Sequence, residues 1–463
     1  MKKVFLLVAG CFLLVVVSYS QTVSQRLNKA FAAFEKDEQL KHAISSFYVI
    51  DAKTGQVVFD KNSQIGLAPA STQKIITSVT AFELLGKDYR YKTQFLLANI
   101  KKEASLLIVP SGDPTLGSWR WNSTRDSNVL ANVGMLIKSF GSILNGAVMV
   151  DIRKWSSQST PDGWIWQDIG NYYGAGSGFL NWRENQYEVL LKSGSKIGDR
   201  VDVIKTIPTL YLPDFKSEVI AAAKGSGDNA YIYLPVNGAN SQVEIRGTIP
   251  VNEQSFSISG SMINPPDQFI ETVVESNKNN FRQPRYLGSI FLNDSINKQV
   301  EREYVHFSPS LDSIIYWFNK KSINLYGEAL IKTFAYEKQG FGRTDSGVAI
   351  VKKFWKETGL DEDELNIYDG SGLSPLNRVT THAQVEVLKY AKTKDWFPFF
   401  LKSLPEYNGM TMKSGTISDV KGFCGYHKAK DGKEYIFSFL VNNYSGKSSQ
   451  LVGKMYKVLD ELK

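Results

Sequence analysis

The stretch Pro69-Ala70-Ser71-Thr72-Gln73-Lys74-Ile75-Ile76-Thr77-Ser78-Val79-Thr80-Ala81-Phe82-Glu83-Leu84-Leu85-Gly86 combines a helical pattern with a reactive pair of side chains. Its apolar residues predict a largely buried helix over 71–85 that begins beside Pro69 and ends at Gly86. Ser71 and Lys74 stand three residues apart, so they lie on one helical face within hydrogen-bond reach. A desolvated lysine can take the proton of a serine without any histidine. The start of a helix also offers backbone N–H donors to a developing oxyanion.

The spacing alone is a weak signal, because Ser-x-x-Lys recurs at three other places in the chain. These begin at Ser193, Ser295 and Ser418. None of the three begins a strongly apolar helix, which favours Ser71 as the reactive serine.

A second candidate motif is Ser322-Ile323-Asn324, within a helical pattern over 310–335. Residues two apart do not share a helix face, so Ser322 and Asn324 can converge on one site only in a loop or at a helix end. Taken by itself the tripeptide is better explained as ordinary capping residues in a helix–turn–helix junction.

The third candidate is Lys413-Ser414-Gly415-Thr416, at the end of a strand predicted over 410–414. Glycine there lets a ligand approach the backbone closely, and the lysine places a cation beside it. This combination suits recognition of a carboxylate.

The order of the predicted strands and helices along the chain indicates one α/β domain that is interrupted by a long insertion. Strands are expected at 47–59, 422–427 and 434–441, and helices at 346–358 and 448–462. Between about 95 and 300, short β-rich runs alternate with turn-forming residues. We therefore predict a signal peptide at 1–20, one domain from 21–95 and 300–463, and an inserted β-rich region of one or two subdomains at 96–299.

The first twenty residues have the pattern of a secretory signal: a basic start, an apolar run over 4–17 and small residues before Gln21. The protein is therefore expected to be exported and periplasmic. Cys11 lies in a sequence like a lipoprotein cleavage box, and a lipid anchor there is the minor alternative. The other cysteine, Cys424, is expected to be buried in a strand.

Composition excludes several classes of function. The chain has 463 residues with 43% hydrophobic and 22% charged side chains, which excludes a disordered or fibrous protein. Its four scattered histidines give no His-rich metal site. The formal charge of +8 becomes +6 once Lys2 and Lys3 leave with the leader. This mild excess, with only isolated lysine pairs, argues against nucleic acid, and an anionic wall polymer is a sufficient partner.

The ordered set Ser71-x-x-Lys74, Ser322-x-Asn324 and Lys413-Ser414-Gly415 resembles the D-alanyl-D-alanine carboxypeptidase/endopeptidase family, the class C low-molecular-mass penicillin-binding proteins. Further blocks of the resemblance are Gly112-Asp113-Pro114-Thr115-Leu116, the stretch from Gly163-Trp164 to Asn185, Glu328, and Asp369-Gly370-Ser371-Gly372-Leu373-Ser374. The resemblance implies an α/β (α+β) penicillin-binding, transpeptidase-like domain with an antiparallel sheet flanked by helices, and the insertion supplies the long gap between the first two motifs.

The resemblance also implies a serine-type D-Ala-D-Ala carboxypeptidase/endopeptidase that works on peptidoglycan peptides through an acyl-serine and is inhibited by β-lactams. Ser71 would be the nucleophile and Lys74 its base. Ser322 would relay a proton to the leaving amine, and Asn324 would hold the substrate amide or Lys74. Lys413, Ser414 and Thr416 would bind the substrate carboxylate, and the N–H groups of Ser71 and Thr416 would form the oxyanion hole. No metal or organic cofactor is implied.

Two departures from the family pattern are visible. Ser414 stands where threonine is more usual, which keeps the hydroxyl. Pro375 stands where many members carry an arginine that reads the side chain of the third stem-peptide residue, so that residue stays open, and Arg378 is a possible substitute.

One alternative function is a catalytically weak penicillin-binding sensor or wall-associated scaffold. A second is a β-lactamase, but the usual compact β-lactamases contain no insertion of this length. The aromatic residues Trp155, Trp164, Trp166, Tyr172 and Tyr173 are interpreted as subdomain core rather than as a glycan platform.

Overall fold

The computed structural model describes residues 21–463 except 101, 142, 212–213, 236–241, 283–284 and 291–298. The predicted leader with Cys11, and the serine motif at Ser295, lie outside the described residues. None of the helices in the described part is long and apolar enough to cross a membrane.

A six-stranded antiparallel sheet forms the centre of the first unit, in the order β16-β17-β18-β19-β1-β2. Its strands are β1 (Ile44–Asp51), β2 (Val57–Lys61), β16 (Glu406–Tyr407), β17 (Met410–Ile417), β18 (Val420–Lys428) and β19 (Glu434–Asn442). Because side chains alternate along a strand, β1 is apolar on both faces. Phe47 and Val49 enter one core, whereas Tyr48 and Ile50 enter the other.

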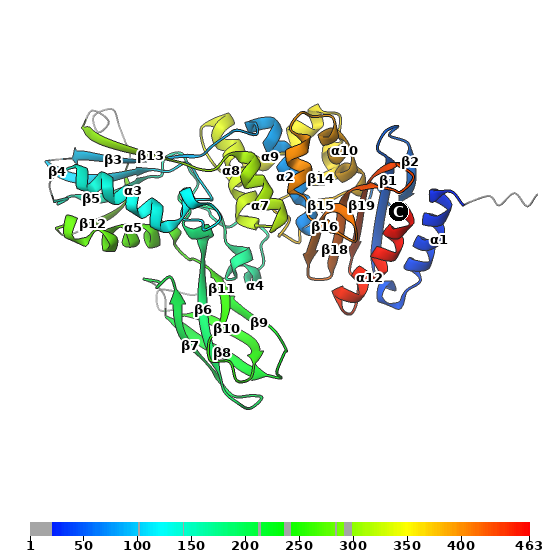
Figure 1. Ribbon diagram of the computed structural model, residues 1–463, viewed down its shortest axis with the longest axis horizontal. Helices are drawn as coiled ribbons and strands as arrows, with labels where there is room; N and C mark the ends of the chain where they lie inside the picture. The colour runs from blue at the N-terminus through cyan, green and yellow to red at the C-terminus, as the bar shows by residue number, and fades with distance from the viewer. Residues whose placement is uncertain are drawn as a thin grey trace, which may run out of the picture.

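Helices cover both faces of this sheet, with α1 and α12 on one face and α2, α8 and α10 contributing to the core on the other (Figure 1). The helices of this unit are α1 (Val23–Glu35), α2 (Lys74–Leu85), α7 (Leu311–Lys320), α8 (Asn324–Gln339), α9 (Thr344–Glu357), α10 (Thr381–Lys392), α11 (Phe397–Ser403) and α12 (Ser448–Leu459). A short β14 (Leu365–Asn366) pairs with β15 (Arg378–Val379). The expected fold class, an antiparallel sheet flanked by helices, is confirmed.

The segment from β3 to β13, residues 92–307, is called the insertion below. Its first part is a five-stranded sheet in the order β12-β5-β4-β3-β13, which packs on two helices. These elements are β3 (Lys92–Ile100), β4 (Glu103–Val109), β5 (Ala147–Asp151), β12 (Arg285–Ile290), β13 (Val300–Phe307), α3 (Asp126–Ser139) and α5 (Pro265–Ser276). The pairing of β13 with β3 places the ends of this sheet at 92 and 307, a few residues outside the 96–299 of the sequence estimate.

The second part of the insertion consists of two three-stranded sheets, β11-β6-β7 and β8-β10-β9. They share one apolar core and extend away from the rest of the molecule in Figure 1. The elements are β6 (Gln186–Ser193), β7 (Val201–Ile207), β8 (Phe215–Ala222), β9 (Asn229–Tyr233), β10 (Val243–Pro250), β11 (Phe256–Ser261) and the short α4 (Trp166–Ile169). The insertion is rich in β-strands, and it also contains the helices α3 and α5, which the β-rich sequence pattern does not predict.

Helix α8 is fastened to the insertion by buried polar contacts. The Lys332 ammonium donates to the carbonyl of Ser177 at 2.6 Å and to the carbonyl of Gln158. The Tyr326 hydroxyl donates to Glu184 Oε1 at 2.7 Å. Lys332 is 1% exposed and Glu184 is fully buried, so the bonds to Ser177 and Glu184 are shielded from water. The position of α8 therefore depends on the insertion.

Replacing Lys332 with methionine tests this attachment. The variant keeps the apolar stem but removes the donor of the Gln158 and Ser177 carbonyls, and the buried Ser177 group left unsatisfied costs about 1–3 kcal/mol. The thermal unfolding midpoint is expected to fall by several degrees, measured by differential scanning calorimetry. Lys338→Met makes the same chemical change at an exposed position of α8 and should leave the midpoint in place. Equal midpoints for the two variants would contradict the attachment.

Candidate active site

The first motif lies where predicted, although its helix begins with a tighter turn. Residues Ala70–Gln73 form a 3-10 turn and the α-helix starts at Lys74. Lys74 is fully buried. Its Nζ lies 2.9 Å from Ser71 Oγ, 2.6 Å from Asn324 Oδ1 and 2.7 Å from the Ser371 carbonyl oxygen. The first two motifs therefore meet at one amine.

These three neighbours determine how the Lys74 amine is used. The amide oxygen of Asn324 and the carbonyl of Ser371 can only accept hydrogen bonds. A neutral amine has two N–H donors for them and one lone pair, which is left for the Ser71 hydroxyl. Burial, followed by the positive charge of Lys413, holds the pKa of Lys74 well below its usual range. Lys74 is thus arranged as a base for Ser71.

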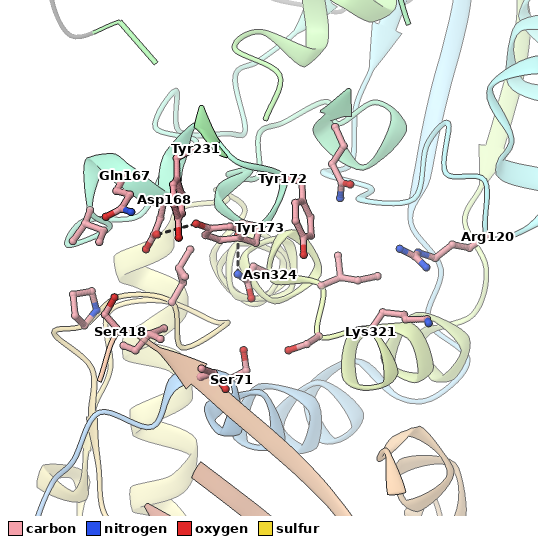
Figure 2. Close-up of a pocket in the computed structure, with 18 residues that line it drawn as sticks. Ser71, Arg120, Gln167, Asp168, Tyr172, Tyr173, Tyr231, Lys321, Asn324 and Ser418 are labelled. Carbon is pink, nitrogen blue, oxygen red and sulfur yellow. Dashed lines mark hydrogen bonds between the residues drawn. The ribbon is translucent and has the colours of Figure 1, made fainter. Parts of the chain in front are cut away.

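The orientation of the Asn324 amide is set by the insertion. Its Nδ2 donates to the carbonyl of Tyr173 at 2.7 Å, which leaves Oδ1 facing Lys74. Figure 2 shows this bond between the start of α8 and the Tyr173 segment. Sequence analysis could not find Tyr173 by its role, because it contributes a backbone atom.

Two carboxyl groups are buried behind Lys74. Asp369 accepts from Gln73 Nε2 at 3.1 Å, Trp164 Nε1 at 2.9 Å and the amides of Gly372 and Ser374 at 2.8 and 2.7 Å. Glu328 accepts from the Gly370 amide at 3.1 Å, and its Oε1 has no partner in the described structure. Burial and the charge of Asp369 raise the pKa of Glu328 to about 8. Glu328 is therefore mostly protonated at neutral pH.

The second motif lies in the turn between α7 and α8, as the spacing of its two polar residues required. Ser322 has a φ of +56°, and Ala70, just before the nucleophile, has a φ of +46°. Side-chain-bearing residues adopt this conformation at a cost of about 1–3 kcal/mol. At Ser322 it accompanies a bond from Lys413 Nζ to the hydroxyl at 3.0 Å. The strain is therefore located at Ser322 and at the residue directly before Ser71.

The third motif lies on β17, and its residues differ in burial and in whether they line the cleft. Lys413 is 1% exposed, and its Nζ also donates to the Ser414 carbonyl at 2.8 Å. Burial lowers the pKa of Lys413 to about 7. Thr416 lines the cleft described below, whereas Ser414 does not. Cys424, on the neighbouring strand, is buried as expected.

Gly415 lets β17 pass directly beside the nucleophile. A Cβ at this position would lie 2.6 Å from the Pro69 carbonyl oxygen and 2.9 Å from the Ser71 amide nitrogen. No side chain fits in that space. The close approach brings the strand backbone against the Ser71 amide, where an oxyanion would be bound.

A cleft of about 620 Å³ opens over Ser71 and has ends of opposite charge. Figure 2 shows Gln167 and Asp168 on one side of Ser71, and Arg120 and Lys321 on the other. Asp168 accepts from the Tyr173 hydroxyl at 3.2 Å, and burial raises the pKa of its carboxyl. These charged residues come mainly from the insertion. Asp168 lies within the 163–185 block of the family resemblance, whereas no motif in the sequence pointed to Arg120 or Lys321.

Pro375 and Arg378 lie differently with respect to the cleft. Pro375 lines the cleft, whereas Arg378 does not, because its guanidinium donates to the Pro375 and Asn377 carbonyls. Trp155 is buried as expected, but Trp166 and Tyr172 are 41% and 51% exposed. Within the described residues, no three His, Cys, Asp or Glu side chains gather into a metal site.

Comparison with known proteins gives consistent matches. The D-Ala-D-Ala carboxypeptidase 3 (S13) family matches residues 27–406. The D-alanyl-D-alanine carboxypeptidase of Actinomadura sp. (strain R39) is 26% identical over 454 residues, which cover 91% of this chain and 81% of that protein. The D-alanyl-D-alanine carboxypeptidase DacB of Haemophilus influenzae is 23% identical over 428 residues, covering 86% and 85%.

A solved structure shares the fold of nearly the whole chain. The crystal structure of penicillin binding protein 4 (dacB) from Haemophilus influenzae superposes with a TM-score of 0.77 at 18% identity, covering 93% of this chain and 98% of that one. The same protein complexed with a novel beta-lactam gives a TM-score of 0.72 at 17% identity, covering 94% and 98%.

Gly415→Ala tests the close approach of β17. The added methyl group must push the strand away from Ser71, and a displacement of about 1 Å at a reacting centre can cost about 100-fold in rate. The rate of covalent modification by benzylpenicillin, followed by intact mass, is expected to fall by about that factor. Gly453→Ala, on α12 with nothing within 4 Å of the new Cβ, serves as the control. A Gly415→Ala variant that reacts at the wild-type rate would contradict the argument.

The pH dependence of the same reaction tests the two lysines. A lysine with a lowered pKa is neutral above that pKa and charged below it. The reaction gains as Lys74 loses its proton and weakens as Lys413 loses the charge that attracts the carboxylate of the β-lactam. We expect the second-order acylation rate to fall as pH rises through about 7. In Lys413→Arg the cation persists, so any remaining activity should lack this fall, whereas Lys428→Arg on β18 should keep it. An unchanged fall in Lys413→Arg would refute the assignment.

Proposed function

The chain belongs to the D-Ala-D-Ala carboxypeptidase 3 (S13) family, and from this membership we propose how its own residues carry out the reaction. The protein is a serine-type DD-peptidase, a hydrolase of peptidoglycan peptides. The observation that supports the mechanism below is the contact of the buried Lys74 amine with Ser71, Asn324 and the Ser371 carbonyl.

In the proposed acylation, Ser71 Oγ attacks the carbonyl carbon of the penultimate D-alanine while Lys74 takes its proton. The oxyanion is stabilised by the backbone N–H groups of Ser71 and Thr416. The C–N bond then breaks, and the leaving amine receives a proton by way of the Ser322 hydroxyl. Water later hydrolyses the acyl-serine with Lys74 again as the base. The net reaction converts one amide and one water into one carboxylic acid and one amine.

Substrate recognition is proposed to use the charges of the site. Lys413, held beside Ser322, attracts the carboxylate of the residue that leaves, or that of a β-lactam. Asp168, at the other end of the cleft, suits an ammonium group on the side chain of the third stem-peptide residue. Pro375 stands at the cleft and Arg378 is turned away, so these two positions supply no cation for a carboxylate on that side chain.

Two kinds of peptidoglycan bond offer the same carbonyl to Ser71, the terminal D-Ala-D-Ala bond and the D-alanyl cross-link. We propose that the protein hydrolyses both, as carboxypeptidase and as endopeptidase. It would do so after export, in the periplasm, with residues 1–20 removed as a signal peptide or, less favoured, with a lipid on Cys11.

A catalytically weak sensor or scaffold is the competing function. The contacts of Ser71, Lys74, Ser322, Asn324 and Lys413 are all intact. A protein without turnover would have no need of the strained backbone at Ala70 and Ser322 or of a lysine whose pKa is lowered by burial. These observations favour an enzyme.

Acylation by benzylpenicillin is the first test of the proposal. Intact mass is expected to show one covalent adduct on the wild type and none on Ser71→Ala, because the only attacking oxygen has been removed. Release of D-alanine from a stem pentapeptide should be lost in the same variant. A folded wild type without an adduct would refute the site, and an adduct that survives in Ser71→Ala would mean that another serine reacts.

A further inference from the structure

The end of the cleft that holds Arg120 and Lys321 has no part in the chemistry described above. Both residues line the cleft, and Figure 2 shows them on the side of Ser71 away from Asp168. Arg120 comes from the insertion, and Lys321 from the end of α7. Two cations from distant parts of the chain therefore border the same cleft.

Arg120 is held rigidly. Its Nε and Nη2 donate to Glu184 Oε1 and Oε2 at 2.7 and 3.0 Å. Glu184 is fully buried and accepts the Ser118 and Tyr326 hydroxyls as well, each at 2.7 Å. The guanidinium lies 5.1 Å from the ring centroid of Trp317 and 5.5 Å from that of Trp119. Nη1 takes no part in the Glu184 bonds, so it is a fixed donor at the cleft.

Lys321 supplies the second cation and a free charge. It is exposed, and it forms none of the ion pairs found among the described residues. It follows Trp317 by four residues at the end of α7, so it lies on the same face of that helix as the ring over which Arg120 stacks. Whereas Glu184 balances the charge of Arg120, nothing in the described structure balances Lys321.

The direction in which the leaving group departs places it at this end. Ser322 is the proposed proton source for the leaving amine, and it directly follows Lys321 in the chain. A free D-alanine ends beside Ser322 and Lys413. When the bond is a cross-link, the departing residue carries a second stem peptide, which must continue beyond Ser322. Stem peptides are acidic, so the continuing peptide brings carboxylates to this end.

We propose that Arg120 and Lys321 form a carboxylate-binding subsite for the departing peptide of a cross-linked substrate. The proposal rests on the proposed function and deepens it. The Nη1 of Arg120 is a donor of fixed orientation for a hydrogen bond to a carboxylate, and the ammonium of Lys321 adds electrostatic attraction. The subsite makes no difference to which bond breaks; it adds binding energy for substrates whose leaving group is a peptide rather than a single amino acid.

The test compares two substrates on the full-length protein: a cross-linked muropeptide dimer and an uncross-linked pentapeptide muropeptide. Lys321→Glu replaces an attraction with a repulsion at an exposed position. It is expected to lower kcat/KM for the dimer at least fivefold more than for the pentapeptide, mainly through KM. Added salt should lower the wild-type kcat/KM for the dimer more than that for the pentapeptide, because the attraction is screened. Lys338→Glu makes the same charge change on α8, away from the cleft, and should leave the ratio of the two activities unchanged.

Arg120→Lys is the second variant, because it keeps a cation for the buried Glu184 while removing the fixed Nη1 donor. Its thermal midpoint is measured alongside, and the same shift in substrate ratio is expected. Equal losses on the two substrates, or no loss on either, in the Lys321→Glu variant would overturn the subsite. A wild type that releases D-alanine from the pentapeptide but does not cleave the dimer would overturn it too. Failure of the proposed function has a different result: no D-alanine release and no penicillin adduct.

Discussion

A lysine amine enclosed away from water, in hydrogen-bond contact only with uncharged groups, is the constraint on which the rest of this site depends. Lys74 has one hydroxyl and two carbonyl-type oxygens as neighbours, from the turn before α2, the start of α8 and the 369–374 loop. A charged ammonium in such a place is costly, whereas a neutral amine has a use for each neighbour. Three segments far apart in sequence must therefore arrive within about 3 Å of one nitrogen.

Close backbone contacts make that convergence possible. A Cβ on Gly370 would lie 2.2 Å from the Gly327 carbonyl oxygen, and a Cβ on Gly372 would lie 1.9 Å from that of Ala70. The first contact seats the 369–374 loop against α8, and the second seats it against the nucleophile's turn. Together with Gly415 on β17, these glycines let backbone segments pack against one another near Ser71 at distances that exclude a side chain. The side chains of the site are placed by main-chain packing as much as by their own bonds.

How much of this could be predicted depends on where the information lies. Ser71 and Lys74 were predictable because helical spacing fixes their relation, and Ser322 and Asn324 because residues two apart need a helix end to converge. The antiparallel sheet and its covering helices were expected from the family resemblance, and the burial of β1 on both faces is consistent with them. The carbonyls of Tyr173 and Ser371 leave no trace in side-chain identity. Asp168 and Arg120 are ordinary charged residues until the insertion folds over the cleft, and α3 and α5 were hidden by the β-rich runs around them.

The bond from the Asn324 amide to the Tyr173 carbonyl has a consequence for how such a protein can change over time. An insertion that merely roofed the cleft could be shortened, lost or exchanged for another module with little penalty. Here it carries one of the acceptors that keep the amide oxygen turned to the base, and it also holds α8 through Lys332 and Tyr326. Recombination at residues 92 and 307 would separate parts that work only as a unit. The first unit and the insertion are therefore expected to be inherited together. Sequence variation should accumulate in the two three-stranded sheets of the insertion rather than at its contacts with α8.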